Sequence, residues 1–243
     1  MASLRSLAVR ERIDHQRGGV VVRWFGLEVD DLALRNSEHL LTTHERNRAD
    51  RFRFDFHRRR FVARRIALRL VIADVIGCSP ERCPVSWAAD GRPVVDVTGP
   101  PICVSTSHSG EVAIIAVSPG SVGVDVECVD PSLPLDDLAP QCLTPVELRW
   151  LADRSPVDRL AGFCRLWTRK EAYLKARGIP LASVDLTQLP VLADDQCVIP
   201  SSWLVSDLPI CDDCSCSLVA APPAARVLRQ PLVLDLELNS VAR

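Results

Sequence analysis

The stretch VAIIAVSPGSVGVDVE, residues 112–127, determines the fold because it contains two strands and the turn that joins them. Residues 112–117 form a continuous apolar run, which is typical of a strand with both faces buried. The Ser-Pro-Gly that follows is a turn signal. Residues 121–127 then alternate strictly, so that valines face a core while a glycine and two carboxylates share the other face.

Helical patterns lie on both sides of this stretch. Apolar residues recur at helical spacing in FVARRIALRLVIADVIG, residues 61–77, and the final glycine predicts the end of a helix. Residues 144–147, TPVE, combine a threonine cap, a proline in the first turn and a glutamate three residues after the cap, which predicts a helix start. Another helix is expected from about Pro156 to Arg177, ending at Gly178.

Shorter strands are expected around these elements. Ile102–Ser105 has the pattern of a strand, with residues 106–110 at its end, and residues 89–93 have the composition of a turn. In the tail, apolar segments separated by turn residues predict strands at 203–208, 216–221 and 232–238.

The order of these elements predicts the fold class. Helices and strands in two successive groups are typical of an α+β protein. We expect an N-terminal half at residues 1–119 and a C-terminal half at residues 120–243, each long enough to bury its own core.

The composition excludes several classes of protein. With 47% hydrophobic and 25% charged residues over 243 positions, the chain is not disordered, collagen-like or a coiled coil. The net charge of −2 excludes a generally basic nucleic-acid binder, and no apolar run approaches the ~18–20 residues that span a bilayer. Residues 1–12 carry no apolar segment with a cleavage site, so we expect a cytoplasmic protein that does not bind membranes.

The ten cysteines are expected to be free thiols. Without a secretory signal, and in a chain of this length, buried thiols acting as small hydrophobic groups are the simpler interpretation. A zinc module at Cys211, Cys214 and Cys216 is an alternative. It is disfavoured because a structural zinc site needs four ligands and the chain has no second Cys-x-x-Cys.

Basic residues are distributed unevenly. The segment Arg46–Arg69 holds ten arginines against the acids Asp50 and Asp55. Three of the arginines stand at the start of a predicted helix, where cations are unfavourable for the helix dipole, so the cluster indicates an anionic ligand. A nucleic-acid or other polyanion-binding module is the alternative function, although it would leave the downstream carboxylates unexplained.

Lysine is rare in this chain, and its two occurrences are close together. Of 29 basic residues, 27 are arginine, and the two lysines are Lys170 and Lys175. An ammonium is a compact point charge, unlike the planar guanidinium, so this placement indicates a specific requirement for lysine. Chance is the alternative.

Asp125 and Glu127 are the first candidate chemical pair. Carboxylates two residues apart on a strand project from the same face, with Cα atoms ~6–7 Å apart. Such a pair repels unless a cation or water separates it, and oxygen ligands of this kind suit Mg²⁺. A solvent-facing side of a sheet is the alternative.

Two further segments are candidates. Glu171 and Lys175 lie one helical turn apart, which is also the spacing of an ordinary surface ion pair. Ser107 and His108, at the end of a predicted strand and next to Ser109-Gly110, have the side chains to contact a phosphate. A serine–histidine nucleophile pair is disfavoured because adjacent residues rarely orient toward each other and no Gly-x-Ser-x-Gly turn is present.

Taken in order, these motifs resemble those of the 4′-phosphopantetheinyl transferases, in particular the larger two-half type that activates nonribosomal peptide and polyketide synthases. The matching stretches are VSTSHSG (104–110), VGVDVE (122–127) and FCRLWTRKEAYLKARG (163–178). The resemblance implies two similar α+β halves related by a pseudo-twofold axis, with the active site in the cleft between them. It implies Mg²⁺-dependent transfer of the phosphopantetheine arm of coenzyme A to a carrier-protein serine, with release of 3′,5′-ADP.

The resemblance also implies roles for particular residues. Asp125, Glu127 and Glu171 would hold Mg²⁺, with Glu171, or a water on the metal, taking the proton of the carrier serine and Lys175 neutralising phosphate charge. The expected coenzyme A contacts are Arg48, Arg60, Arg92, Ser107, His108, Lys170 and Lys175, with Arg92 in place of the family's lysine. The expected partners are coenzyme A and apo carrier proteins, not nucleic acid, and we expect a monomer.

Overall fold

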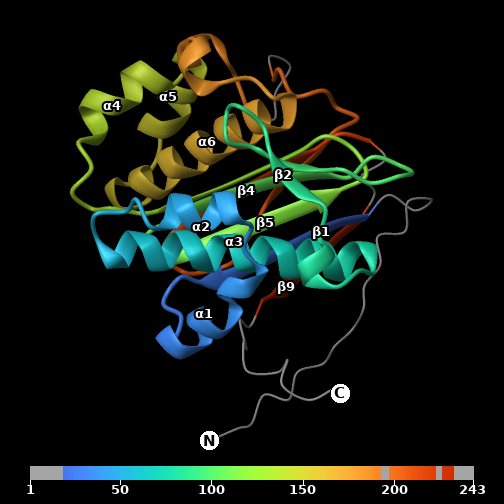
Figure 1. The fold of residues 1–243 in the computed structure, drawn as a ribbon. Coiled ribbons are helices and arrows are strands. Elements are labelled where there is room, and N and C mark those ends of the chain that lie inside the picture. Colours follow the sequence, from blue (N-terminus) through green and yellow to red (C-terminus); the bar gives the residue numbers. More distant parts are fainter. Residues whose placement is uncertain (1–18, 193–196, 223–225, 233–243) are drawn as a thin grey trace, which may run out of the picture.

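The computed structural model describes residues 19–192, 197–222 and 226–232 of the 243-residue chain. These residues combine helices and sheets in an α+β fold, as predicted (Figure 1). The strands are β1 (Gly19–Gly26), β2 (Val85–Trp87), β3 (Pro93–Val95), β4 (Cys103–Ser109), β5 (Val112–Ser118), β6 (Val122–Cys128), β7 (Leu204–Asp207), β8 (Cys214–Ala220) and β9 (Arg226–Pro231). The α-helices are α1 (Asp31–Ser37), α2 (Thr43–Ala49), α3 (Asp55–Ile76), α4 (Leu135–Cys142), α5 (Pro145–Ala152) and α6 (Pro156–Arg177). Short 3₁₀ helices cover Glu38–Leu40, Pro80–Arg82, Leu181–Ser183 and Leu186–Gln188.

The strands of the described residues form two larger sheets and a short hairpin. One sheet has the order β4-β5-β1-β9, and the other has the order β6-β8-β7. In the first sheet, β5 pairs antiparallel with β4 and β1, whereas β9 comes from the C-terminal part of the chain and pairs parallel with β1. In the other sheet, β8 pairs antiparallel with both neighbours. The hairpin of β2 and β3 contains the predicted turn at residues 89–93.

A helix of 22 residues packs on each of the larger sheets. The helix α3 buries apolar side chains against β1 and β5, and α6 packs on β6 and β8 (Figure 1). Both helices end at a glycine in the left-handed region, Gly77 with φ 73° and Gly178 with φ 65°, which L-residues with a Cβ rarely adopt. Both predicted helix ends are therefore confirmed.

The predicted helices agree with the structure except at one end. The helix α5 begins as expected, with Thr144 and Glu147 forming the predicted capping box, and α6 begins and ends as expected. The helix α3 begins at Asp55 rather than Phe61, so Arg58–Arg60 lie inside its first turns.

Two strand predictions need correction. The segment 106–110 was expected beyond a strand, but β4 continues to Ser109 because Ser107 pairs with Ile114 and Ser109 with Val112 of β5. In the tail, β7 and β8 match two predicted strands, whereas residues 233–238 of the third lie outside the described residues. The structure also contains β9 at residues 226–231, a strand that was not predicted.

The strand β6 is covered on both faces, and Gly123 is the reason. A Cβ at Gly123 would lie 1.8 Å from Ala172 O and 2.5 Å from Ala176 N, so only glycine lets α6 approach so closely. The carboxylate face of β6 therefore lies under α6, and Asp125 is only 2% exposed. The alternative of a solvent-facing side is wrong for Asp125.

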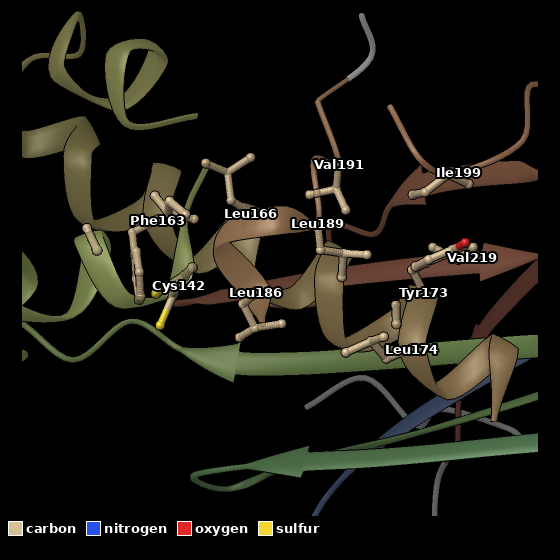
Figure 2. Packing of buried hydrophobic residues seen from close by; sticks show 14 of the residues in the cluster. Cys142, Phe163, Leu166, Tyr173, Leu174, Leu186, Leu189, Val191, Ile199 and Val219 are labelled. Atoms are coloured by element: carbon tan, nitrogen blue, oxygen red, sulfur yellow. The ribbon is translucent and has the colours of Figure 1, made fainter. Parts of the chain in front are cut away.

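An apolar core surrounds α6 and includes side chains from most of the C-terminal helices and strands. Figure 2 shows side chains of α6, including Phe163, Leu166, Tyr173 and Leu174, together with Leu186 of the 3₁₀ segment and Val219 of β8. This packing fixes the helix against the sheet, so that the opposite side of α6 has a defined position over β6.

The prediction of buried free thiols is correct for Cys83, Cys142, Cys164 and Cys216, whereas four other free cysteines are only half-buried and two cysteines are not free. Cys211 and Cys214 form a disulfide, with Cα atoms 5.5 Å apart, whereas the other eight cysteines are free. The prediction failed because sequence alone did not show that the chain returns at residues 211–214 to bring two sulfur atoms together. No helix in the described ranges is both long and apolar enough to cross a membrane.

Candidate active site

Three carboxylates gather where β6 meets α6. Asp125 and Glu127 come from β6, and Glu171 comes from α6. Burial raises the pKa of all three, and the charge of Asp125 further raises the pKa of Glu127 and of Glu171. The structure therefore brings together the three side chains that were predicted to hold a metal.

Asp125 has one satisfied oxygen and one free oxygen. Its Oδ1 accepts hydrogen bonds from Ser107 Oγ at 2.7 Å and from Lys175 Nζ at 2.6 Å. Its Oδ2 is buried and has no hydrogen-bond partner. A buried carboxylate oxygen without a partner is costly, so this atom is suited to a cation or another donor.

Lys175 connects the helix to the strand. Its Nζ also donates to Ser107 Oγ at 3.2 Å and to Val124 O at 3.3 Å, and it lies 3.7 Å from Glu171 Oε2. The ammonium is thus surrounded by oxygen atoms on the carboxylate side of α6. The pair of Glu171 and Lys175 is not an ordinary surface ion pair here, because Lys175 also contacts the buried Asp125 of β6.

The donor set fits Mg²⁺ in its chemistry. The three carboxylates offer only oxygen, and the free Oδ2 of Asp125 points to a missing partner. In the residues that the structure describes, no three His, Cys, Asp or Glu side chains are arranged around a common point as metal ligands are. At Asp125, the position beside Oδ1 holds the ammonium of Lys175. The metal assignment therefore stays a prediction.

Serines of β4 contact the carboxylates from the other sheet. Ser107 Oγ donates to Asp125, and Ser109 Oγ donates to Glu127 Oε2 at 2.8 Å. In the sequence, Ser109 stands next to the Ser-His pair, and no role was predicted for it beyond that of a small neighbour. The signal was present, because serines at positions 105, 107 and 109 share one face of a strand.

His108 faces cations rather than carboxylates. Arg64 Nη1 lies 3.1 Å from His108 Nδ1, so this nitrogen is the acceptor and the proton of the neutral ring is on Nε2. Partial removal of water from the ring, with the positive charges of Arg64, Lys175 and Arg60, lowers the pKa of His108 to about 4. At neutral pH the ring is an uncharged hydrogen-bond donor.

A cavity of about 320 Å³ lies next to this histidine. Arginines and aromatic rings line it together with Ser107 and His108. The guanidinium of Arg65 lies 3.2 Å from the centre of the Trp87 ring. Arg48 and Arg64 also line the cavity. Three of the expected coenzyme A contacts, Arg48, Ser107 and His108, line this cavity together with Arg64, Arg65 and Trp87, which sequence reasoning missed.

A second cavity of about 270 Å³ lies beside the C-terminal part of α6. Asp90 lines both cavities, and Arg92, Glu171 and Lys175 line the second. Arg92 pairs with Asp90 at 2.6 Å, and a Cβ at Gly178 would lie 2.7 Å from Arg92 Nη1. The predicted residue Arg92 therefore lies beside Glu171 and Lys175.

Two predicted coenzyme A contacts are not where the sequence analysis expected them. Lys170 is completely buried, 2.7 Å from Glu147 Oε2, and donates to Leu186 O at 2.7 Å. It points into the C-terminal core, one residue away from Glu171 but on another side of the helix, so it does not reach the carboxylate cluster. Arg60 pairs with Glu111 and donates to Gly110 O at 2.8 Å, outside the residues that line the first cavity.

Part of the arginine-rich segment forms ion pairs within the fold. Arg58 pairs with Glu38, Arg59 with Asp31, and Arg69 with the buried Glu45. These partners neutralise part of the cluster, while Arg48, Arg64 and Arg65 face the first cavity. Three arginines of this segment are thus available to an anionic ligand in the first cavity.

Similarity to known proteins was found for the same region. The family model of the 4′-phosphopantetheinyl transferase superfamily matches residues 121–221, a range that includes β6 and α6. The chain is 28% identical over 200 residues to the 4′-phosphopantetheinyl transferase HetI of Nostoc, covering 80% of this chain and 84% of that protein. It is 32% identical over 136 residues to the 4′-phosphopantetheinyl transferase AcpT of Salmonella typhimurium, covering 54% and 69%. It is 30% identical over 135 residues to the 4′-phosphopantetheinyl transferase psf-1 of Bacillus pumilus, covering 55% and 56%.

Proposed function

The chain belongs to the 4′-phosphopantetheinyl transferase superfamily and is a transferase of that family, and from this premise we propose how its residues act. The enzyme transfers the phosphopantetheine arm of coenzyme A to a serine of an apo acyl or peptidyl carrier protein and releases 3′,5′-ADP. The observation that carries this proposal is the cluster of Asp125, Glu127, Glu171 and Lys175 beside an arginine-lined cavity.

The carboxylates hold Mg²⁺ in this proposal. Asp125 would bind through its free Oδ2, with Glu127 and Glu171 as the other protein ligands. When bound, Mg²⁺ supplies positive charge at the pyrophosphate during transfer. Its charge would also offset the burial that raises the pKa of all three carboxyl groups and the repulsion from Asp125 that further raises the pKa of Glu127 and of Glu171.

Glu171 is the general base. The carrier serine loses its proton to this carboxylate while its oxygen bonds to the transferred phosphorus, and the bond from phosphorus to the leaving 3′,5′-ADP breaks. The raised pKa of Glu171, caused first by burial, makes its carboxylate a better proton acceptor at neutral pH.

Cations and donors along the two cavities bind the anionic parts of coenzyme A. Lys175 compensates phosphate charge from α6, and the neutral His108 donates from Nε2. Arg48 and Arg64 bind the 3′-phosphate in the larger cavity, and Arg92 contacts the nucleotide from the second. Phosphoryl transfer requires chiefly such positioning and charge compensation.

The two-half architecture belongs to the same proposal. Support comes from the two 22-residue helices, α3 and α6, each ending at a left-handed glycine and each packed on a sheet. The catalytic carboxylates come from the second sheet and its helix, whereas Ser107 and His108 come from the first sheet. We propose that the active site lies between two similar halves, with the boundary near residue 120.

Release of 3′,5′-ADP tests this function. The protein is incubated with coenzyme A, Mg²⁺ and a panel of apo carrier proteins, and the nucleotide product is separated by chromatography. We expect release that requires the carrier's acceptor serine and stops with a chelator. The matched control is a carrier with that serine changed to alanine. No release with any carrier, with Mg²⁺ or Mn²⁺ present, would contradict the proposed function.

A further inference from the structure

The strands β4 and β6 lie side by side, although they belong to different sheets. Each is at the edge of its own sheet. Ser105 Oγ accepts a hydrogen bond from Val124 N at 3.0 Å, and Ser109 Oγ accepts one from Cys128 N at 3.1 Å. Both contacts join residues 19 positions apart, so the two strands run in the same direction.

Serine side chains therefore connect the two sheets, at a place where adjacent strands of one sheet would form backbone–backbone hydrogen bonds. Ser105, Ser107 and Ser109, the β4 serines, occupy alternate positions and share the face that meets β6. A serine side chain is short enough for the two edges to approach and still carries a donor and an acceptor.

The directions of the two hydrogen bonds of the Ser109 hydroxyl follow from its partners. The backbone N–H of Cys128 can only donate, so Ser109 Oγ accepts from it. The single proton of the hydroxyl is then available for the other contact, Glu127 Oε2 at 2.8 Å. Glu127 thus receives a directed hydrogen bond from the opposite sheet.

The hydroxyl of Ser107 likewise accepts one hydrogen bond and donates its proton to a carboxylate, that of Asp125. Lys175 Nζ can only donate to Ser107 Oγ, so the hydroxyl proton goes to Asp125 Oδ1. Asp125 already has Lys175 as a second partner at the same oxygen, and Glu127 accepts a hydrogen bond from Ser109. Ser109 is thus one of two side chains, with Trp167, that hydrogen-bond the Glu127 carboxylate.

The end of β4 is itself held in place. A Cβ at Gly110 would lie 2.7 Å from Cys128 Sγ, and Cys128 Sγ contacts Ser109 O at 3.3 Å. On the other side, Arg60 donates to Gly110 O at 2.8 Å. Ser109 is thus part of a packed strand end rather than a free loop.

We propose that Ser109 is a positioning residue that fixes the Glu127 carboxylate beside Asp125, so that the pair can bind a divalent cation. This inference rests on the proposed function. It gives the β4 strand of the first sheet a direct effect on the metal ligands of the other sheet. Hydrogen-bond partners of ligating side chains usually change metal affinity by ~10–100-fold when they are removed.

Binding of Mn²⁺ to the purified protein tests the inference without turnover. Mn²⁺ takes the same oxygen ligands as Mg²⁺, and its free and bound forms are distinguished by electron paramagnetic resonance. We expect Ser109→Ala to weaken Mn²⁺ binding by about tenfold, and Ser109→Thr, which keeps the hydroxyl, to bind close to wild type.

Ser105→Ala is the matched control. It removes a hydroxyl from the same face of the same strand, but the Ser105 hydroxyl accepts its hydrogen bond from the backbone of β6 rather than contacting a carboxylate. We expect it to lower the melting temperature, because Val124 N–H loses its partner, and to leave Mn²⁺ affinity unchanged. All variants are compared at a temperature where melting curves show them folded.

The outcomes separate this inference from the proposed function. If wild type binds Mn²⁺ and Ser109→Ala binds equally well, the inference is overturned alone. Equal loss of affinity in Ser105→Ala also overturns it, since the effect would then be a general loosening between the sheets. A wild-type protein that binds no Mn²⁺ overturns the metal part of the proposed function and the inference with it.

Discussion

Lys175 Nζ lies 2.6 Å from Asp125 Oδ1, and this contact joins the C-terminal part of α6 to the middle of β6. Asp125 is almost fully buried, whereas Lys175 is 29% exposed. The carboxylate thus offers one oxygen to the ammonium and keeps Oδ2 without a protein partner. This division allows one aspartate to serve both a lysine and a metal, which is the central claim of the proposed site.

The first prediction concerns the size of the cation at position 175. Lys175→Arg should lower kcat/KM for coenzyme A by ~100-fold, since the planar guanidinium cannot occupy the space between Ser107, Val124 and Asp125 without displacing them by ~1 Å. Arg177→Lys, a swap on the last turn of the same helix, is the control and should keep normal transfer. Wild-type kcat/KM in Lys175→Arg would mean that any cation suffices there.

The second prediction concerns the buried aspartate. Asp125→Asn should lower kcat/KM by at least ~100-fold, because metal stabilisation of the transferring phosphate is worth several kcal/mol. Its melting temperature without Mg²⁺ should not fall, since burial already disfavours the charged carboxylate. Thermal melts with and without Mg²⁺ should also lose the Mg²⁺-induced shift seen in wild type. A variant with normal turnover at low Mg²⁺ would remove Asp125 from the site.

The third prediction separates Lys170 from catalysis. Lys170→Met leaves Glu147 buried without its cation and should destabilise the protein by about 3–5 kcal/mol, while the folded fraction keeps a normal kcat. Urea unfolding and transfer assays below the transition measure the two effects. Adding Glu147→Gln should restore part of the stability. A stable Lys170→Met protein that transfers poorly would instead support the phosphate contact indicated by the sequence.

The fourth prediction concerns the charge of His108. Its pKa of about 4 lies below the 6.5 of an ordinary histidine, so the unfolded chain binds the proton more readily between these values. The contribution of His108 to the unfolding free energy should therefore rise as pH increases from about 4 to 6.5 and then stay constant. An NMR titration of the ring should show the low pKa in wild type and a higher pKa in Arg64→Gln. A wild-type titration near 6.5 would contradict the arrangement.

Much of the site could be predicted from local sequence patterns. The two-residue period of β6 placed Asp125 and Glu127 on one face, and the helical period of α6 placed Glu171 and Lys175 together. The start of α5 followed from a threonine cap, and the end of α6 followed from a left-handed glycine. These features depend on residues that are close together in the sequence, so the sequence alone could predict them.

Other features depend on contacts between distant segments. The burial of Asp125 requires Gly123 to meet Ala172, a contact that no local pattern encodes. Lys170 and Lys175 look alike in sequence, but the helix turns Lys170 toward Glu147 and Lys175 toward Asp125. The roles of Ser109 and Arg64 required the position of β4 beside β6 and of α3 beside β4.

Intact-mass spectrometry of an apo carrier protein tests the central claim most directly. The carrier is incubated with coenzyme A, Mg²⁺ and either the wild-type enzyme or Asp125→Asn. The account predicts a gain of ~340 Da, one phosphopantetheine arm, with wild type and Mg²⁺, and little or no gain with a chelator or with the variant. An unmodified carrier across a broad panel, or equal modification by wild type and Asp125→Asn, would contradict it.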